Sequence, residues 1–327
     1  MKRYKLKLII LSCILLPIIS SCTYLYLNKV HFNKPIHIIY ISKSNDMTNG
    51  FWRSIANGAE LATSEYGIEL SIRTPDEEES YASQNKLIYE AINEKPDAII
   101  LAAAGRKETY DAAKEIVNND IILVLVDSTV EGDIADAVVA TNNYQAGIRI
   151  GAVMKTFLED GDKIGIISSV EGTSTAIDRE AGIRMGLSDD KERIADTYFA
   201  ESNTEKAEEL TKEMLTKYPD IKAIATLNQH SSVGAGRALK ELGLDGEVFL
   251  FGFDNAKEQI TYLEDGTFQA LLIQKPFNMG YISVETAIKL VKGQQVEQDV
   301  NTGSALITKD NMYSSLHQKL LFPFMEE

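Results

Sequence analysis

Residues 223–242 read AIATLNQHSSVGAGRALKEL, and this stretch carries the clearest signature of the fold. Residues 223–227 form an apolar run that predicts a buried strand, and the run ends abruptly at Asn228 and Gln229. Apolar residues at helical spacing follow at once, with Ser231 or Ser232 available to cap the helix. A buried strand that brings a polar amide beside a helix N-terminus is typical of an open α/β sheet, whose ligands bind at that edge.

The same alternation of short β-branched runs and longer amphipathic segments extends over the whole body of the chain. Strands are predicted at 36–41, 69–73, 98–102, 121–126, 137–140, 163–167, 194–198, 223–227, 248–251 and 270–273, and helices at 51–66, 81–95, 107–118, 143–158, 177–187, 204–218, 231–242, 256–265 and 277–292. Short loops between them predict parallel sheets with helices on both faces. The order restarts once, which indicates two doubly wound α/β domains, and the last third suggests that the chain crosses between them more than once.

Composition excludes several classes of function. The chain has 327 residues, 44% of them hydrophobic, and a net charge of -15, so its size suits two domains and its acidity argues against a nucleic-acid partner. Its two cysteines, Cys13 and Cys22, both precede the body, and none of its four histidines has a partner at metal-ligand spacing. We therefore expect no disulfide, no metal and no cofactor in the body.

The N-terminus has the character of a targeting segment. Four positive charges within residues 1–7 precede an almost wholly apolar stretch at 8–19 and the sequence Ile19-Ser20-Ser21-Cys22. The segment resembles a bacterial lipoprotein signal, in which Cys22 is lipid-modified and becomes the first residue. The alternative is an uncleaved anchor, since 8–27 reaches about the ~20 apolar residues that span a bilayer. Both place the body outside the cytoplasm, on a membrane tether at 28–35.

Polar and aromatic side chains follow the predicted strands and suit a neutral polyhydroxylated ligand. Carboxylates, amides and an arginine exchange hydrogen bonds with hydroxyl groups, and aromatic faces stack on the apolar side of a sugar ring. Each residue also has a structural interpretation: an aspartate can cap the next helix, an aromatic pair can belong to the core, and an arginine can form a surface ion pair. The candidate ligand-binding residues are Ser44, Asn49, Phe51, Trp52, Asp127, Ser128, Arg179, Asn228, Asp254 and Gln274.

The order and spacing of several motifs resemble those of periplasmic sugar-binding proteins of the ribose- and galactose-binding type, related in fold to the ligand-binding core of the lac repressor. The motifs are Asn49-Gly50-Phe51-Trp52, Val126-Asp127, Gly172-Thr173-Ser174 with Arg179, Asn228, Gly252-Phe253-Asp254 and Gln274. The resemblance covers about residues 36–308. It implies a type I periplasmic-binding-protein fold with a three-crossover hinge near Thr141-Asn142, Asp254 and Gln274. It also implies one lobe at 36–141 and 275–303, and a second at 142–274 and 304–327, after residues 1–35.

The resemblance also implies a role for each site residue. Phe51 and Trp52 would sandwich a sugar, while Asn49 and Asp127 bond its hydroxyls from the first lobe. Arg179, Asn228 and Asp254 would contact it from the second lobe, with Gln274 near the hinge. The chain departs from the ribose-binding pattern at three places: Ser128 replaces an arginine, Glu201-Ser202-Asn203 lacks an aromatic residue, and Gln229 replaces an aspartate.

Two other classes of function need features that this sequence lacks. An enzyme would need Asp127 and Asp254 as an acid/base pair, but no nucleophile–histidine–acid set is visible. A transcription regulator would need an N-terminal helix-turn-helix, where this chain has a membrane signal. We therefore expect a monomeric solute-binding protein, not an enzyme, that presents a sugar or polyol to the permease of an ABC importer. The alternative is a sensory receptor whose partner is a histidine kinase or a chemoreceptor.

Overall fold

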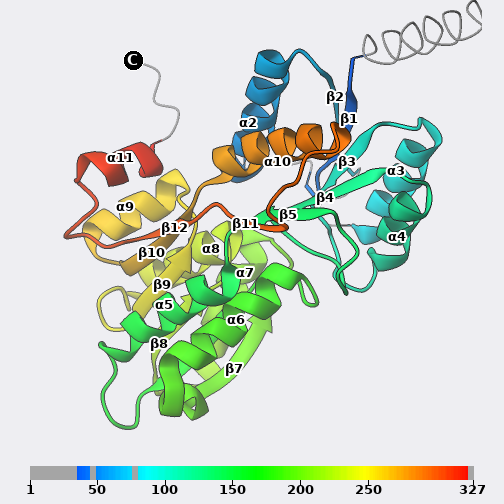
Figure 1. Cartoon of the computed structure of the whole chain (residues 1–327). Helices are drawn as coiled ribbons and strands as arrows, with labels where there is room; N and C mark the ends of the chain where they lie inside the picture. Colours follow the sequence, from blue (N-terminus) through cyan, green and yellow to red (C-terminus); the bar gives the residue numbers. More distant parts are fainter. Residues whose placement is uncertain (1–34, 45–48, 76–79, 323–327) are drawn as a thin grey trace, which may run out of the picture.

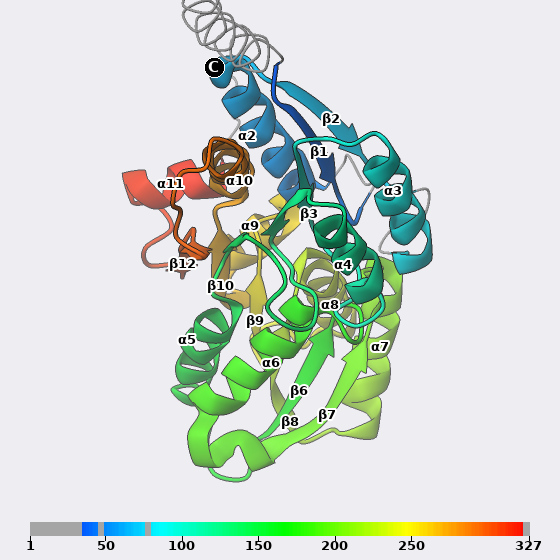
Figure 2. The same cartoon turned by 45° about the vertical axis from the view of Figure 1, so that its right-hand side comes forward.

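The first of two sheets is entirely parallel. The structure is a computed structural model that describes residues 35–44, 49–75 and 80–322. The sheet has the order β11-β5-β4-β3-β1-β2. Its strands are β1 (His37–Ile41), β2 (Glu69–Arg73), β3 (Ala98–Leu101), β4 (Ile122–Val126), β5 (Ala137–Ala140) and β11 (Asp299–Asn301). Helices α2 (Gly50–Tyr66) and α10 (Pro276–Val291) pack on one face, and α3 (Tyr81–Asn93) and α4 (Tyr110–Asn118) on the other (Figure 2). We call this unit the first lobe.

The second sheet repeats this arrangement with the order β12-β10-β9-β8-β6-β7, in which only β12 runs antiparallel. Its strands are β6 (Lys163–Ser168), β7 (Ile194–Phe199), β8 (Ile221–Thr226), β9 (Phe249–Phe253), β10 (Phe268–Gln274) and β12 (Ser304–Ile307). Helices α5 (Asn143–Lys155) and α6 (Ser174–Leu187) cover one face; α7 (Thr204–Lys217), α8 (Gln229–Leu242) and α9 (Lys257–Asp265) cover the other. A 3₁₀ helix, η1 (Ser188–Arg193), follows α6, and α11 (Ser315–Leu321) follows β12. Figure 1 shows this second lobe below the first.

In each lobe, neighbouring helices approach closely through glycine. In the second lobe, a Cβ added to Gly182 of α6 would lie 2.1 Å from the carbonyl oxygen of Tyr144 in α5. In the first lobe, a Cβ on Gly280 of α10 would lie 1.9 Å from the carbonyl oxygen of Ile55 in α2. Only glycine allows such contact, so these positions lock α5 to α6 and α10 to α2.

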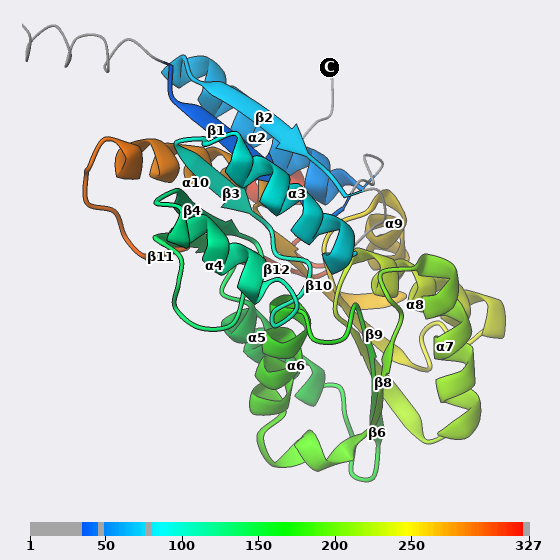
Figure 3. The same ribbon diagram turned by 90° about the vertical axis from the view of Figure 1, so that its right-hand side faces the viewer.

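The chain passes between the lobes three times. It leaves the first sheet after β5, returns after β10, and crosses again between β11 and β12 (Figure 3). The predicted crossings near Thr141-Asn142 and Gln274 are therefore confirmed, but the one near Asp254 is wrong, because β9 and α9 both belong to the second lobe. The third crossing lies at Thr302-Gly303, where the positive φ of Gly303 (77°) turns the chain. Strands β11 and β12 were not predicted, because each is too short to show a pattern.

Helix α8, which follows β8, begins at Gln229, two residues earlier than predicted. Asn228 caps α8: its Oδ1 accepts a hydrogen bond from the Ser231 backbone N–H at 2.9 Å, and Ser231 Oγ accepts one from the Asn228 backbone N–H at 3.0 Å. Ser231 therefore completes a reciprocal capping box, and neither it nor Ser232 is the N-cap. Within the described ranges, no helix combines the length and the apolar character needed to cross a membrane. The predicted signal or anchor at 1–35, with Cys22, lies almost wholly outside those ranges.

Candidate ligand-binding site

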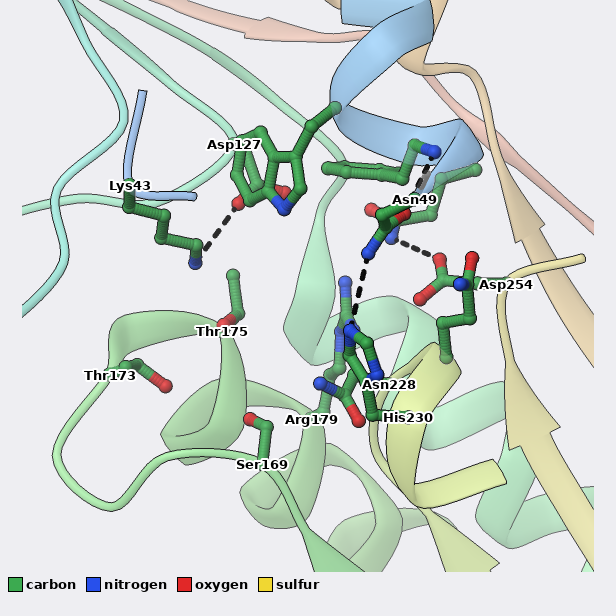
Figure 4. Close-up of a pocket in the computed structure, with 14 residues that line it drawn as sticks. Lys43, Asn49, Asp127, Ser169, Thr173, Thr175, Arg179, Asn228, His230 and Asp254 are labelled. Atoms are coloured by element: carbon green, nitrogen blue, oxygen red, sulfur yellow. Dashed lines mark hydrogen bonds and ion pairs between the residues drawn. The ribbon is translucent and has the colours of Figure 1, made fainter. Parts of the chain in front are cut away.

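A pocket lies between the two lobes, where the carboxyl ends of both sets of parallel strands face each other (Figure 4). The space between its lining atoms is about 470 Å³, a volume that includes a part open to solvent. Its lining is mostly polar: Lys43, Asn49, Phe51, Trp52, Asp127, Ser169, Thr173, Thr175, Arg179, Asn228, Gln229, His230, Asp254 and Gln274.

Two carboxylates occupy equivalent places in the two sheets. Asp127 follows β4 and Asp254 follows β9, each the third strand in its sheet order. Both adopt a left-handed backbone conformation, with φ of 63° and 73°, and neither caps a helix. That conformation disfavours non-glycine residues by ~1–2 kcal/mol, and such strain is concentrated at functional sites. The structure therefore argues against helix capping as the role of either aspartate.

The wall from the first lobe combines an ion pair with an aromatic pair. Lys43 Nζ lies 3.3 Å from Asp127 Oδ2, and both side chains are about 95% buried. The same ammonium lies 5.4 Å from the ring centroid of Trp52, within reach of a cation–π interaction. Phe51 meets Trp52 edge to face at 5.1 Å between centroids. Because Trp52 also packs into the core, its interpretation as a core residue and as a pocket residue both hold.

Arg179 lines the pocket from the second lobe, and its side chain is buried. Its Nε donates to Asn143 Oδ1 at 2.8 Å and its Nη1 to the Leu227 carbonyl at 2.6 Å, while the guanidinium stacks on Phe253 at 4.4 Å. These bonds use two of its five N–H groups. Burial lowers the pKa of Arg179, and the nearby Asp254 and Asp127 oppose that shift, so it stays a cation. It is not a surface ion pair.

Asp254 accepts a hydrogen bond from Gln274, which lies at the hinge. Gln274 Nε2 donates to Asp254 Oδ1 at 2.7 Å, and the buried Gln274 Oε1 has no hydrogen-bond partner among the described residues. Burial raises the pKa of Asp254; Arg179 and the bond from Gln274 counteract this, and Asp127 adds to it. A lone acceptor on the pocket lining is suited to a ligand hydroxyl.

The lobes also meet directly around the pocket. Asn49 caps α2 through its Oδ1, and its Nδ2 lies 3.5 Å from His230 Nε2 at the start of α8 (Figure 4). Beside the pocket, the Thr129 backbone N–H donates to Ser174 Oγ at 2.8 Å. The two lobes are therefore closed upon each other in this structure.

The pocket brings together eight of the ten predicted site residues, namely Asn49, Phe51, Trp52, Asp127, Arg179, Asn228, Asp254 and Gln274. Ser44 and Ser128 are buried but do not line it, because Ser128 Oγ donates to the Ala103 carbonyl at 2.9 Å and Ser44 lies in the turn where its N–H meets Ser42 Oγ. Ligand binding by these two serines stays a prediction. Lining residues that the sequence prediction left out are Lys43, Ser169, Thr173, Thr175, Gln229 and His230.

Some of the omitted residues had a signal in the sequence. Lys43 follows a predicted strand, as Ser169 follows another, and the strand-end rule applies to both. His230 could not be found this way, because it belongs to the first turn of α8, two residues after the strand-end amide. Among the described residues there is no group of three or more histidine, cysteine or carboxylate side chains that could hold a metal ion.

Comparison with known proteins agrees with this architecture. Residues 40–295 match the model of the periplasmic binding protein domain family. The D-ribose/D-allose-binding protein of Pseudomonas aeruginosa is 26% identical over 89% of this chain and 95% of its own length. The ribose import binding protein of Bacillus subtilis is 23% identical over 85% of this chain and 89% of its own.

Two solved structures are similar in sequence as well as in fold. A sugar transporter from Clostridium phytofermentans is 48% identical, with a TM-score of 0.79, over 84% of this chain and 99% of its own. An ABC transporter solute-binding protein from Agrobacterium vitis with bound D-fucose is 28% identical, with a TM-score of 0.82, over 87% of this chain and 99% of its own. With its two parallel-sheet lobes and the match over most of its length, this chain belongs to the periplasmic binding protein family and has the type I fold.

Proposed function

We propose that this chain captures a neutral sugar or polyol between its lobes and presents it to the permease of an ABC importer. The observation that carries the proposal is the lining of the pocket. The lining combines hydrogen-bond donors from Lys43 and Arg179 with the acceptors of Asp127, Asp254 and Gln274. The two cations balance the two carboxylates, which favours a ligand without net charge.

Each side chain has a defined role in this proposal. The Phe51–Trp52 pair covers the apolar face of the sugar ring, and Asn49 and Asp127 bond its hydroxyls from the same lobe. Lys43 holds one oxygen of Asp127 and so orients the other. Arg179, Asn228 and Asp254 bind from the second lobe, with Gln274 Oε1 accepting at the hinge. The lobes in this proposal comprise 36–141 with 275–303, and 142–274 with 304–327.

Closure links binding to the partner. Ligand binding favours the closed arrangement, in which the lobes meet at Asn49–His230 and Thr129–Ser174, and the permease would recognise that arrangement. The names of the relatives support transport: one is an import binding protein and another a solute-binding protein of an ABC transporter.

We further propose that the protein acts outside the bacterial cytoplasm as a monomer, held at the membrane by a lipid on Cys22. The alternative, an uncleaved anchor at 8–27, predicts that mature protein retains Met1, which mass spectrometry distinguishes. We propose no catalytic role, because the relatives named above are binding proteins.

Uptake of labelled sugar tests the transport role. A panel of D-ribose, D-allose, D-arabinose and D-fucose is first screened by thermal shift, because a bound sugar raises the melting temperature by mass action. A strain without this protein should then lose uptake of the sugar that binds, and the wild-type chain should restore it. Binding without any change in uptake would contradict import and favour the sensory alternative.

A further inference from the structure

We infer that the C-terminal segment 308–322 supports the binding pocket, and that Asn255 is the positioning residue through which it acts. The inference rests on the proposed function of the pocket as a sugar site. It concerns a segment that lies beyond β12, the last strand of the second sheet, and that contributes no residue to the pocket lining.

The segment is docked on the second lobe through apolar and polar contacts. Met312 and Leu321 are each 2% exposed and belong to the same hydrophobic core as Leu263 of α9. Tyr313 OH donates to Glu264 Oε1 of α9 at 2.6 Å. Figure 1 shows α11 lying beside α9. The segment is thus packed against the element that follows the Asp254 loop.

Asn255 joins this segment to the pocket. Its Nδ2 donates to the Leu320 carbonyl at 3.0 Å and to the Leu321 carbonyl at 3.1 Å. These are the last two residues of α11, whose terminal carbonyls have no partner within the helix. The Asn255 side chain therefore caps the C-terminus of α11 while its backbone directly follows Asp254.

The neighbour of Asn255 in the chain, Asp254, has a strained backbone that its surroundings must hold. Asp254 holds φ at 73°, its backbone N–H donates to the Leu272 carbonyl at 3.0 Å, and its carboxylate faces Gln274 and Arg179. A left-handed aspartate persists only when its surroundings fix it. The β10 strand fixes Asp254 through the bond to Leu272, the Gln229 backbone N–H donates to its carboxylate, and the Asn255–α11 contact holds the residue that follows it. Loss of that contact frees the backbone after Asp254 and lets the carboxylate turn away from the ligand.

The test replaces Asn255 with its near-isostere aspartate. Asn255→Asp removes both N–H donors and faces two carbonyls with a carboxylate, while Tyr313→Phe removes a tail contact that does not involve the Asp254 loop. We expect Asn255→Asp to weaken binding of whichever panel sugar binds the wild-type chain by about tenfold, and Tyr313→Phe to leave it within twofold. A purely structural role would lower the melting temperature and leave the affinity unchanged, which would overturn the inference.

Hydrogen exchange gives a second readout that needs no sugar. In Asn255→Asp the backbone amides of 254–256 should exchange faster than in the wild-type chain, and unchanged exchange there would also overturn the inference. Coupling between the pocket and α11 must act in both directions. A bound sugar should therefore slow hydrogen exchange of the backbone amides of 315–321 in the wild-type chain. If no panel sugar binds, the panel is extended to other monosaccharides and polyols, and the proposed function fails only if none of them binds; exchange at 254–256 decides the role of Asn255 in either case.

Discussion

Replacing Arg179 with alanine perturbs the pocket most sharply. The guanidinium is 4% exposed, and it faces both carboxylates of the site. In the proposed site Arg179 donates a charge-assisted hydrogen bond to a ligand hydroxyl, and we expect the loss of that bond to cost ~2–4 kcal/mol of binding free energy. At ~1.4 kcal/mol for each tenfold change, the dissociation constant rises roughly 30- to 700-fold.

The same substitution also lowers stability, and the two effects must be separated. Without the guanidinium, Asn143 Oδ1 and the Leu227 carbonyl lose their donor, and each unsatisfied buried acceptor costs about 1–3 kcal/mol. We therefore expect a lower melting temperature as well as weaker binding. Calorimetric titration with the cognate sugar, at a temperature where the variant is fully folded by circular dichroism, measures the affinity alone.

Arg184 supplies the matched control on the same helix. Its side chain is 41% exposed and pairs with Glu180 at 2.6 Å, a surface ion pair worth at most ~1 kcal/mol. Arg184→Ala should leave the dissociation constant within twofold of the wild-type value. If Arg179→Ala also binds within twofold while folded, the assignment of Arg179 to the ligand is refuted.

Three further predictions concern packing, charge and pH. Gly182→Ala should lower the free energy of unfolding in urea by about 1–3 kcal/mol, because its Cβ would collide with the α5 backbone. In the control Gly50→Ala, where the added Cβ has no atom within 4 Å, the change should be less than ~0.5 kcal/mol. Equal effects of the two variants would contradict the close helix contact. Lys43→Met should lower the free energy of unfolding by ~3–5 kcal/mol, because it leaves the buried Asp127 carboxylate without its ammonium partner. Adding Asp127→Asn should recover much of that loss, and no recovery would contradict the ion pair. Because burial raises the pKa of Asp254, sugar affinity should be full above that pKa and should fall as the pH drops through it, starting above the ordinary carboxyl value of ~3.9. Calorimetry on Asp254→Asn should show no such fall. A wild-type affinity that stays constant down to pH 4 would refute the role of the carboxylate.

The sequence was sufficient for the fold because parallel α/β units repeat a strong local pattern. Every predicted strand and helix is present, with ends displaced by a few residues. The prediction lacks the return of the chain through β11 and β12, whose pairing with β5 and β10 depends on contacts between distant segments. Such pairing leaves no periodicity in runs of three or four residues.

The site was predictable where position along a strand decides the chemistry. Asp127, Asn228 and Asp254 each follow a strand directly, and the carboxyl ends of parallel strands meet at one edge. Side-chain direction was not predictable, which is why Ser128 was included although its hydroxyl turns to a backbone carbonyl. The partnership of Lys43 with Asp127 joins two strand ends 84 residues apart in sequence, and only the folded chain reveals it.

The single tryptophan of the chain, Trp52, lines the pocket and so reports on it directly. Titration of the full-length protein with D-ribose, D-allose, D-arabinose and D-fucose, followed by tryptophan emission, tests whether a sugar binds between the lobes. We predict a saturable change in Trp52 emission with at least one of these sugars, shifted to at least 30-fold higher concentration in Arg179→Ala. A sugar that binds by calorimetry without altering the emission of Trp52, or that binds Arg179→Ala equally well, would place its site elsewhere and contradict the account.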